Sequence, residues 1–413
     1  RYLLRGVPSS FAGTENPPAR QMIQGDHLQL LYNYWLAADM IRGKTPLFHN
    51  LYEFNTGDDA ERRSVGCYNM PFSLVFTAGY WAGGRALGFN LLGLFTIWLT
   101  FLATWLLVRR FLHDETAAWL LALVAIIFPY RWVNQLGGSP AAFAMTWVPI
   151  LLFGIDIAIR DGRWTGGVVA AFAMLFAYWG DTHVFFFSLL LVPLWGMLSL
   201  IHTAHWHWRV PGHLRRAALA LAPLVMMILL CVALSWMQKK VLTAAVGQGG
   251  KRSIYEIMLF SPRPWEFLAW TGFGVYLGFV MLGTLGLSVV LWATALVVDI
   301  RRHWRSGLVF ALMGVMLYGM VLMALGPRGW DGRGLFNFFQ RNVPFYSMIR
   351  QPAKILAVFP TFAALAIAIP LGMWLAWRPA IRSWLIGVVA VLIAGAVLEY
   401  GLQVKPDICL VDR

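Results

Sequence analysis

Residues 86–108 read ALGFNLLGLFTIWLTFLATWLLV and are followed directly by Arg109 and Arg110. The run holds no acidic or basic side chain, and it has the length of about 20 mostly apolar residues that a helix needs to cross a bilayer. It predicts a transmembrane helix that ends at a pair of cations. Similar runs recur along the rest of the chain.

The composition extends this prediction to the whole protein. Of the 413 residues, 59% are hydrophobic and 13% are charged, whereas a soluble domain carries about 25% charged residues. These values exclude an ordinary cytosolic enzyme, a disordered chain and a DNA-binding domain. The formal net charge is +14 at pH 7, and Lys and Arg in membrane proteins anchor loops or contact anionic lipid. We expect an all-α, polytopic protein of the membrane with lipid and not nucleic acid as its partner.

Ten runs are predicted to cross the membrane. They are residues 86–108, 116–133, 141–159, 165–180, 184–201, 217–236, 269–298, 307–326, 353–377 and 383–399. Short basic loops separate them at residues 109–110, 160–163, 209–216, 301–305 and 378–382, and the positive-inside rule places such loops in the cytoplasm. Residues 1–85 then lie outside. A chain that begins outside without a signal peptide implies a further span before Arg1, eleven in all.

The predicted organisation has three parts. Residues 1–85 form an outer loop, residues 86–399 the transmembrane bundle, and residues 400–413 an outer tail that would lead into a further soluble domain. Within the loop, residues 26–41 carry apolar side chains at helical spacing, namely Leu28, Leu31, Trp35 and Leu36. Because Tyr and Trp suit the membrane interface, we expect an interfacial helix across the top of the bundle. An ordinary surface helix is the alternative.

Two acidic residues are candidates for chemistry. Asp26 opens the amphipathic stretch, and Asp181 lies between two spans that almost no loop joins. A carboxylate so close to hydrocarbon is costly, and it marks a functional candidate. Each has a histidine nearby, His27 and His183, so Asp26, Asp181 and His183 could bind a divalent cation such as Mg²⁺ or Mn²⁺, or transfer protons. The alternative for Asp181 is a helix cap.

Basic residues on the predicted outer side form a second group of candidates. Arg350 and Lys354 flank Pro352 where a span begins, and Arg252 follows a glycine-rich turn. Arg binds phosphate through two hydrogen bonds, Lys adds a point charge, and Pro352 could begin a helix whose N-terminus faces an anion. Side chains that merely extend to the membrane surface are the alternative.

Other classes of protein lack support. The chain has no Ser-His-Asp order with a nucleophile elbow, no zinc-protease motif and no Cys-x-x-Cys pair. Charge within the predicted spans is almost absent apart from Asp156 near a helix end, which disfavours ion-coupled transport. A transporter should also show paired half-helices and polar groups at the midplane, and neither is evident.

Several motifs together resemble the GT-C superfamily of membrane glycosyltransferases, in particular bacterial members linked to lipoteichoic acid glycosylation. They are the early Gly25-Asp26-His27-Leu28, the Gly-x-x-Pro-Leu-Phe stretch at residues 43–48, the later Asp181, and Arg350-Gln-Pro-Ala-Lys354, which is similar to an Arg-x-Pro-x-Arg pattern. The resemblance covers the whole chain in layout but only short motifs in residues. The chain departs from many members in carrying single acids where they have an Asp-x-Asp or Glu-x-Asp pair.

The resemblance implies an enzyme of the bacterial inner membrane that moves a sugar from a polyprenyl phosphate carrier to a glycan, lipid or protein acceptor outside, with inversion. Asp26 would be the general base and Asp181 would bind the acceptor or a metal ion. Arg350 and Lys354, with Arg252, His27 and His183, would bind the donor and its leaving phosphate. The alternatives are a non-catalytic subunit of a membrane complex and a transporter or flippase for lipid-linked sugars.

Overall fold

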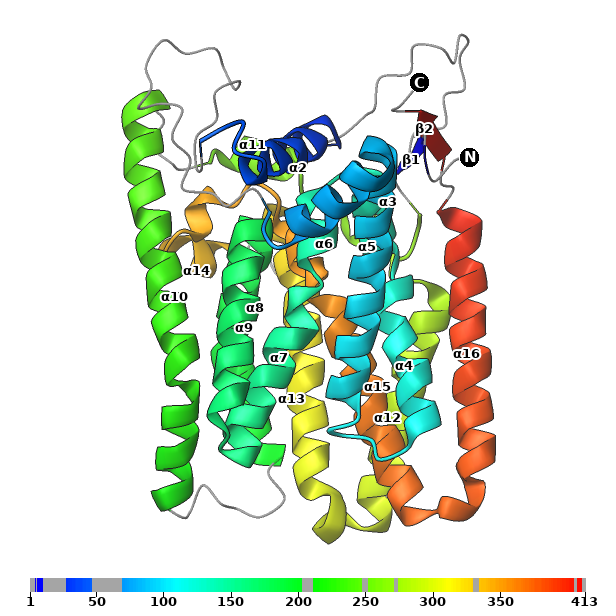
Figure 1. Ribbon diagram of the computed structural model, residues 1–413. Coiled ribbons are helices and arrows are strands. Elements are labelled where there is room, and N and C mark those ends of the chain that lie inside the picture. Colours follow the sequence, from blue (N-terminus) through cyan, green and yellow to red (C-terminus); the bar gives the residue numbers. More distant parts are fainter. Residues whose placement is uncertain are drawn as a thin grey trace.

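Helices account for nearly all of the regular structure in this computed structural model (Figure 1). It describes residues 4, 6–9, 27–46, 69–202, 211–246, 252–270, 274–329, 334–404 and 407–410. The elements before residue 203 are β1 (Gly6–Ser9), α2 (His27–Ile41), α3 (Phe72–Val108), α4 (Glu115–Ile127), α5 (Pro129–Leu136), α6 (Pro140–Ala144), α7 (Trp147–Asp156), the π-helix η2 (Ile157–Asp161), α8 (Trp164–Gly180) and α9 (Thr182–His202).

The second half continues the same pattern. Its elements are α10 (Pro211–Val246), α11 (Ile254–Leu259), η4 (Pro264–Phe267), α12 (Phe279–Val298), α13 (Ile300–Leu325), η5 (Gly326–Arg328), α14 (Gly334–Asn342), η6 (Tyr346–Met348), η7 (Pro352–Ala357), α15 (Phe359–Trp377), η8 (Pro379–Ile381), α16 (Arg382–Gln403) and β2 (Asp407–Leu410). The all-α prediction is confirmed for the described residues. The two short strands pair antiparallel, with Gly6 opposite Leu410.

Eight helical segments within the described residues are long and apolar enough to cross a membrane. A ninth candidate is the pair α4–α5, which bends by 43° at Phe128. The predicted span at residues 165–180 corresponds to α8, which is apolar but shorter than the other candidates. The chain is therefore an integral membrane protein by the length and composition of its helices, and the count of ten spans remains a prediction.

Two predicted spans begin later than their apolar runs. Residues 269–298 predicted one span, but α12 begins at Phe279, after Gly274 and Gly278 take positive φ angles that a helix cannot include. The span predicted from residue 353 starts with η7, and α15 begins only at Phe359. Pro352 therefore begins the short 3-10 helix η7 and not the long helix α15, and the anion site predicted at this position remains a prediction.

The short basic loops all meet at one end of the bundle, which we call the basic end (Figure 1, bottom). Arg110 joins the first loop to the second through ion pairs of 2.7 Å with Asp156 and with Asp161. Three further hydrogen bonds connect helix ends here. His213 of α10 contacts Ile159 O of η2, Arg302 of α13 donates to Ala376 O of α15, and Arg382 of α16 donates to Asp114 directly before α4. These contacts hold the helix ends together at the basic end.

The other end of the bundle carries the short helices (Figure 1, top). There α2 lies across the ends of the long helices, at the residues that the sequence predicted. The predicted face is buried in part, because Leu31 and Leu36 are buried whereas Leu28 is exposed. Leu30 and Tyr34, which the prediction did not include, are buried as well. Tyr34 stacks on Phe76 at 5.3 Å between ring centroids, so aromatic packing fixes the helix on the bundle.

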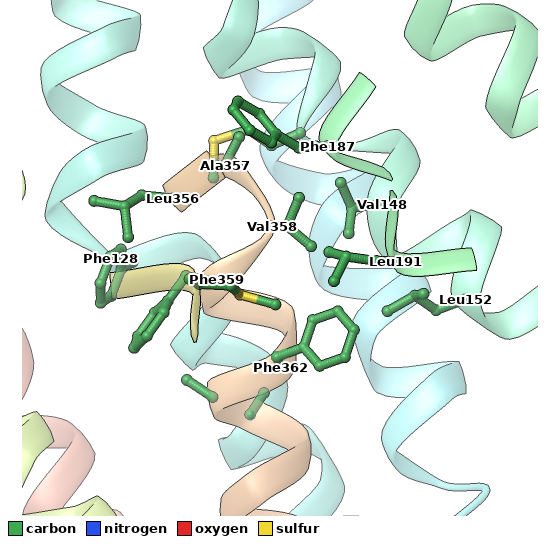
Figure 2. Close-up of a cluster of buried hydrophobic side chains, with 14 of the residues drawn as sticks. Phe128, Val148, Leu152, Phe187, Leu191, Leu356, Ala357, Val358, Phe359 and Phe362 are labelled. Carbon is green, nitrogen blue, oxygen red and sulfur yellow. The ribbon is translucent and has the colours of Figure 1, made fainter. Parts of the chain in front are cut away.

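The buried core lies around the junction of η7 and α15. Figure 2 shows Leu356 to Phe359 and Phe362 facing Phe128 on one side and side chains of α7 and α9 on the other. The rings of Phe128 and Phe359 are 5.4 Å apart, and both side chains are almost fully buried. This packing holds η7, and the residues just before it, against the bend between α4 and α5.

Candidate functional site

Asp181 occupies the tight turn that joins α8 to α9. Its backbone N–H still donates to Ala177 O at 2.9 Å, so it ends one helix while its side chain begins the next. One carboxylate oxygen accepts hydrogen bonds from the backbone N–H groups of His183 at 2.8 Å and Val184 at 3.0 Å. This is N-cap geometry, the alternative that the sequence had left open.

Lys354 approaches the same carboxylate from a distant part of the chain. Its ammonium group lies 2.9 Å from the second Asp181 oxygen, and both side chains are largely buried. Burial alone would raise the pKa of Asp181, but the charge of Lys354 and the contacts with His183 hold this pKa below its usual value. The structure thus brings together two candidate residues to which the sequence analysis had assigned different roles. Each side chain is the ion-pair partner of the other.

His183 completes this group. Its Nδ1 atom lies 3.5 Å from Asp181, which is a contact but too long for a strong hydrogen bond. Within the described residues, no third Asp, Glu, Cys or His joins the two in an arrangement that could hold a metal ion. A metal ion on Asp181 would have to displace Lys354. The described donors therefore do not fit Mg²⁺ or Mn²⁺.

Arg350 stands four residues before Lys354 and differs from it in its surroundings. Its side chain is exposed, and its guanidinium lies 4.7 Å from the ring centre of Phe260. No carboxylate in the described part of the chain pairs with it. Arg252 lies on the same side of the fold, since its backbone N–H donates to Ser347 O at 3.0 Å, but its side chain pairs with Glu256 at 3.1 Å. Arg350 is therefore the cation best placed to meet a ligand.

His27 is fully buried and serves packing. Its ring lies 5.6 Å from that of Phe89, its Nε2 is 3.2 Å from Pro8 O, and it fills the space above Gly138. Asp26, the predicted base, lies outside the described residues, as does Lys251 beside the glycine-rich turn. His27 lies against the α5–α6 turn at Gly138, at the end opposite the basic end.

Residues 69–71 also reach the Asp181 turn. In the amide orientation that satisfies its hydrogen bonds, Asn69 donates to Gly180 O at 2.9 Å, directly before Asp181. The described segments of the predicted outer loop therefore contact the end of the bundle that carries Asp181, Lys354 and Arg350.

Arg131 is the residue that the sequence reasoning missed. It lies in α5, within the predicted span at residues 116–133, and its side chain is fully buried. The statement that charge within the spans is almost absent is therefore wrong at this position. The signal was present, because an Arg directly after Phe128-Pro129-Tyr130 in an apolar run is the costly intramembrane cation that marks a functional site.

The chain matches no protein-family model, no curated protein and no solved structure. The interpretation depends on the chemistry of the residues. The end opposite the basic end offers a neutralised Asp181–Lys354 pair and an exposed Arg350 that has no carboxylate partner among the described residues.

Proposed function

We propose that the protein is a membrane glycosyltransferase of the GT-C type, which transfers a sugar from a polyprenyl phosphate to an acceptor at the membrane face opposite the basic loops. The observation that carries the proposal is the position of Arg350. Its exposed guanidinium has no carboxylate partner among the described residues, and Arg350 stands four residues before Lys354, which a buried ion pair holds in place. Arg suits phosphate because it can donate two parallel hydrogen bonds.

In the proposed reaction, an acceptor hydroxyl attacks the anomeric carbon of the sugar. The new bond to the acceptor oxygen forms as the bond to the phosphate oxygen breaks, and the electron pair leaves with the phosphate. Asp26 takes the proton of the hydroxyl, and Arg350 stabilises the charge that gathers on the phosphate. The configuration of the anomeric carbon inverts because the nucleophile and the leaving group occupy opposite faces.

The geometry changes the roles that we assign to Asp181 and Lys354. Asp181 has a low pKa and both oxygens occupied, so it suits the positioning of η7 better than proton transfer. Lys354, held by Asp181, fixes the segment from residue 350 to residue 354 and leaves Arg350 as the cation for phosphate. Both are positioning residues in this proposal.

Binding of undecaprenyl phosphate by the purified protein in detergent tests the donor site. Wild type should bind it, and Arg350→Ala should weaken binding about 10- to 100-fold, the value of a hydrogen bond to a charged group. Arg341→Ala, an exposed Arg on the neighbouring α14, is the matched control. Undecaprenol, which lacks the phosphate, should bind with equal affinity to Arg350→Ala and Arg341→Ala. Equal binding of undecaprenyl phosphate by wild type and Arg350→Ala would remove the basis of the proposal.

A transporter or flippase for lipid-linked sugars is the second candidate. It is supported by the break between α4 and α5 and by the buried Arg131, since discontinuous spans with polar groups mark transporter sites. Movement of a labelled undecaprenyl-phosphate sugar across proteoliposomes without transfer to any acceptor would favour this role over the enzyme.

A further inference from the structure

The span formed by α4 and α5 is broken, and the break places one cation inside the protein. Phe128 adopts an extended backbone conformation and Pro129 then starts α5, so the second half of the span points in a new direction. Arg131 lies in the first turn after the break and is fully buried. Irregular backbone at such a position is tolerated in membrane proteins where it is packed in protein or lines a cavity.

Only one edge of the Arg131 guanidinium is satisfied. Nη1 donates to Thr100 Oγ1 at 2.9 Å, whereas Nε and Nη2 are buried and have no partner among the described residues. Nε and Nη2 carry parallel N–H groups on one side of the planar group. That edge is the one with which Arg binds two oxygens of a single carboxylate or phosphate.

The neighbouring hydroxyl groups cannot satisfy this edge. Thr100 Oγ1 already contacts Thr96 O at 2.6 Å and Thr146 Oγ1 at 2.9 Å, which ties α3 to the α6–α7 junction. Gln135 lies one turn after Arg131 on the same face of α5, is buried, and has an Oε1 atom without a partner among the described residues. A strip of polar groups therefore lines α5 where it faces α3.

A counter-charge is also missing. No carboxylate in the described part of the chain forms an ion pair with Arg131, and burying an isolated cation costs several kcal/mol even after relaxation. Water could fill a hydrogen bond but would leave the charge uncompensated. A spherical anion would match the two parallel N–H groups of Nε and Nη2 poorly, whereas an anion with two oxygens matches both the charge and the geometry of the guanidinium.

We infer that Arg131 is the binding residue of an oxyanion site inside the bundle, where the broken α4–α5 span meets α3. The ligand is a carboxylate or phosphate group that accepts two hydrogen bonds from Nε and Nη2, with the Gln135 amide beside it. It arrives either as a free anion or as part of a lipid. This inference is independent of the proposed glycosyl transfer, which uses Arg350.

Thermal unfolding of the purified protein in detergent tests the site, with inorganic phosphate and acetate as probes and chloride at equal ionic strength as the reference. Both oxyanions should raise the unfolding temperature of the wild type above its value in chloride. In Arg131→Lys, which keeps the charge but loses the fork, the midpoint concentration of phosphate should rise about 10- to 100-fold. Arg131→Met should abolish the effect.

Two control variants separate this site from the rest of the protein. Arg341→Met, an exposed cation, should respond to phosphate like the wild type. A phosphate response that is lost in Arg350→Ala but kept in Arg131→Met would assign the anion to the proposed donor site and overturn the Arg131 site. An unchanged response in Arg131→Lys and Arg131→Met would overturn it as well.

Mass spectrometry of the intact complex identifies the source of the anion. A phospholipid that remains bound to wild type and Arg341→Met, but is lost from Arg131→Lys, supports the site with a lipid as its ligand. A phosphate response in lipid-free wild type supports the site with a free anion. If the wild type shows neither a bound lipid nor a response to oxyanions, the chain supplies its own counter-charge and the inference is wrong.

Discussion

The ammonium nitrogen of Lys354 lies 2.9 Å from the carboxylate of Asp181, across 173 positions of sequence. The pair fastens η7 to the turn between α8 and α9. Removing one partner of a buried ion pair is far more costly than removing both, because the remaining charge stays in a poor solvent.

Lys354→Met should lower the free energy of unfolding by about 3–5 kcal/mol, since it leaves the Asp181 carboxylate buried without its cation. Asp181→Asn should cost less, because Asn also caps helices and Lys354 is the more exposed partner. The double variant should be more stable than the sum of the two losses predicts. Chemical denaturation in a single detergent measures all three, and strictly additive losses would contradict a coupled pair.

The same pair predicts a pH dependence. The pKa of Asp181 is lower in the folded protein than its ordinary value of 3.8, so the pair stabilises the fold above that value and the contribution is lost as pH falls through the folded-state pKa. The difference in unfolding temperature between wild type and Asp181→Asn should therefore stay constant from pH 8 to about pH 5 and shrink only below about pH 4. A difference that vanished between pH 7 and pH 6 would mean that another group titrates.

Gly167 should tolerate no side chain. A Cβ atom there would lie 1.7 Å from Ala220 O, a backbone atom of α10 that cannot rotate away. Gly167→Ala should separate α8 from α10 and destabilise the protein by about 1–3 kcal/mol. Gly286→Ala is the control, because nothing lies within 4 Å of its added Cβ and Ala favours a helix. Unfolding temperatures of the two variants should move in opposite directions.

Glu399 should be required to hold α16 against the start of α12. Its carboxylate accepts hydrogen bonds from Tyr276 OH at 2.5 Å and from the backbone N–H groups of Phe279 at 2.7 Å and Val280 at 2.9 Å. Glu399→Ala leaves these donors without their acceptor and should cost about 1–3 kcal/mol. Glu256→Ala, whose partner Arg252 is solvated, should cost less than about 1 kcal/mol. Equal losses in the two variants would argue against this role.

The orientation of the protein can be read from two single cysteines. In a background without Cys67, Cys231 and Cys409, Lys44→Cys and Arg301→Cys place thiols at exposed positions of opposite bundle ends. A membrane-impermeant reagent should label residue 44 in intact cells and residue 301 only after the membrane is opened, as the positive-inside rule predicts. Labelling of residue 301 alone in intact cells would invert the topology.

The sequence predicted what depends on local composition. Apolar runs identified the helices, and spacing identified α2 at nearly its observed limits, because both signals lie within a few turns of chain. Ends of spans were less accurate where backbone conformation decides them, as at Gly278 before α12. The face that α2 buries depends on partners such as Phe76, and these cannot be read from α2 itself.

The candidate site was predicted as separate residues and not as an arrangement. Asp181 and Lys354 were selected for different roles, and only the fold reveals that each neutralises the other. Arg131 shows the opposite failure, because an apolar average concealed a single costly charge. Its importance comes from what surrounds it, namely a bent span and two N–H groups without partners among the described residues.

The antiparallel pairing of β1 with β2 has a consequence for biosynthesis. Gly6 is made before its partner Leu410, which is added only after every helix between them has been made. At about 5–20 residues per second, β1 must wait about 20–80 s for its partner strand. Closure of this small sheet therefore requires that α16 has been inserted and that its far end has reached the side of the membrane that holds β1.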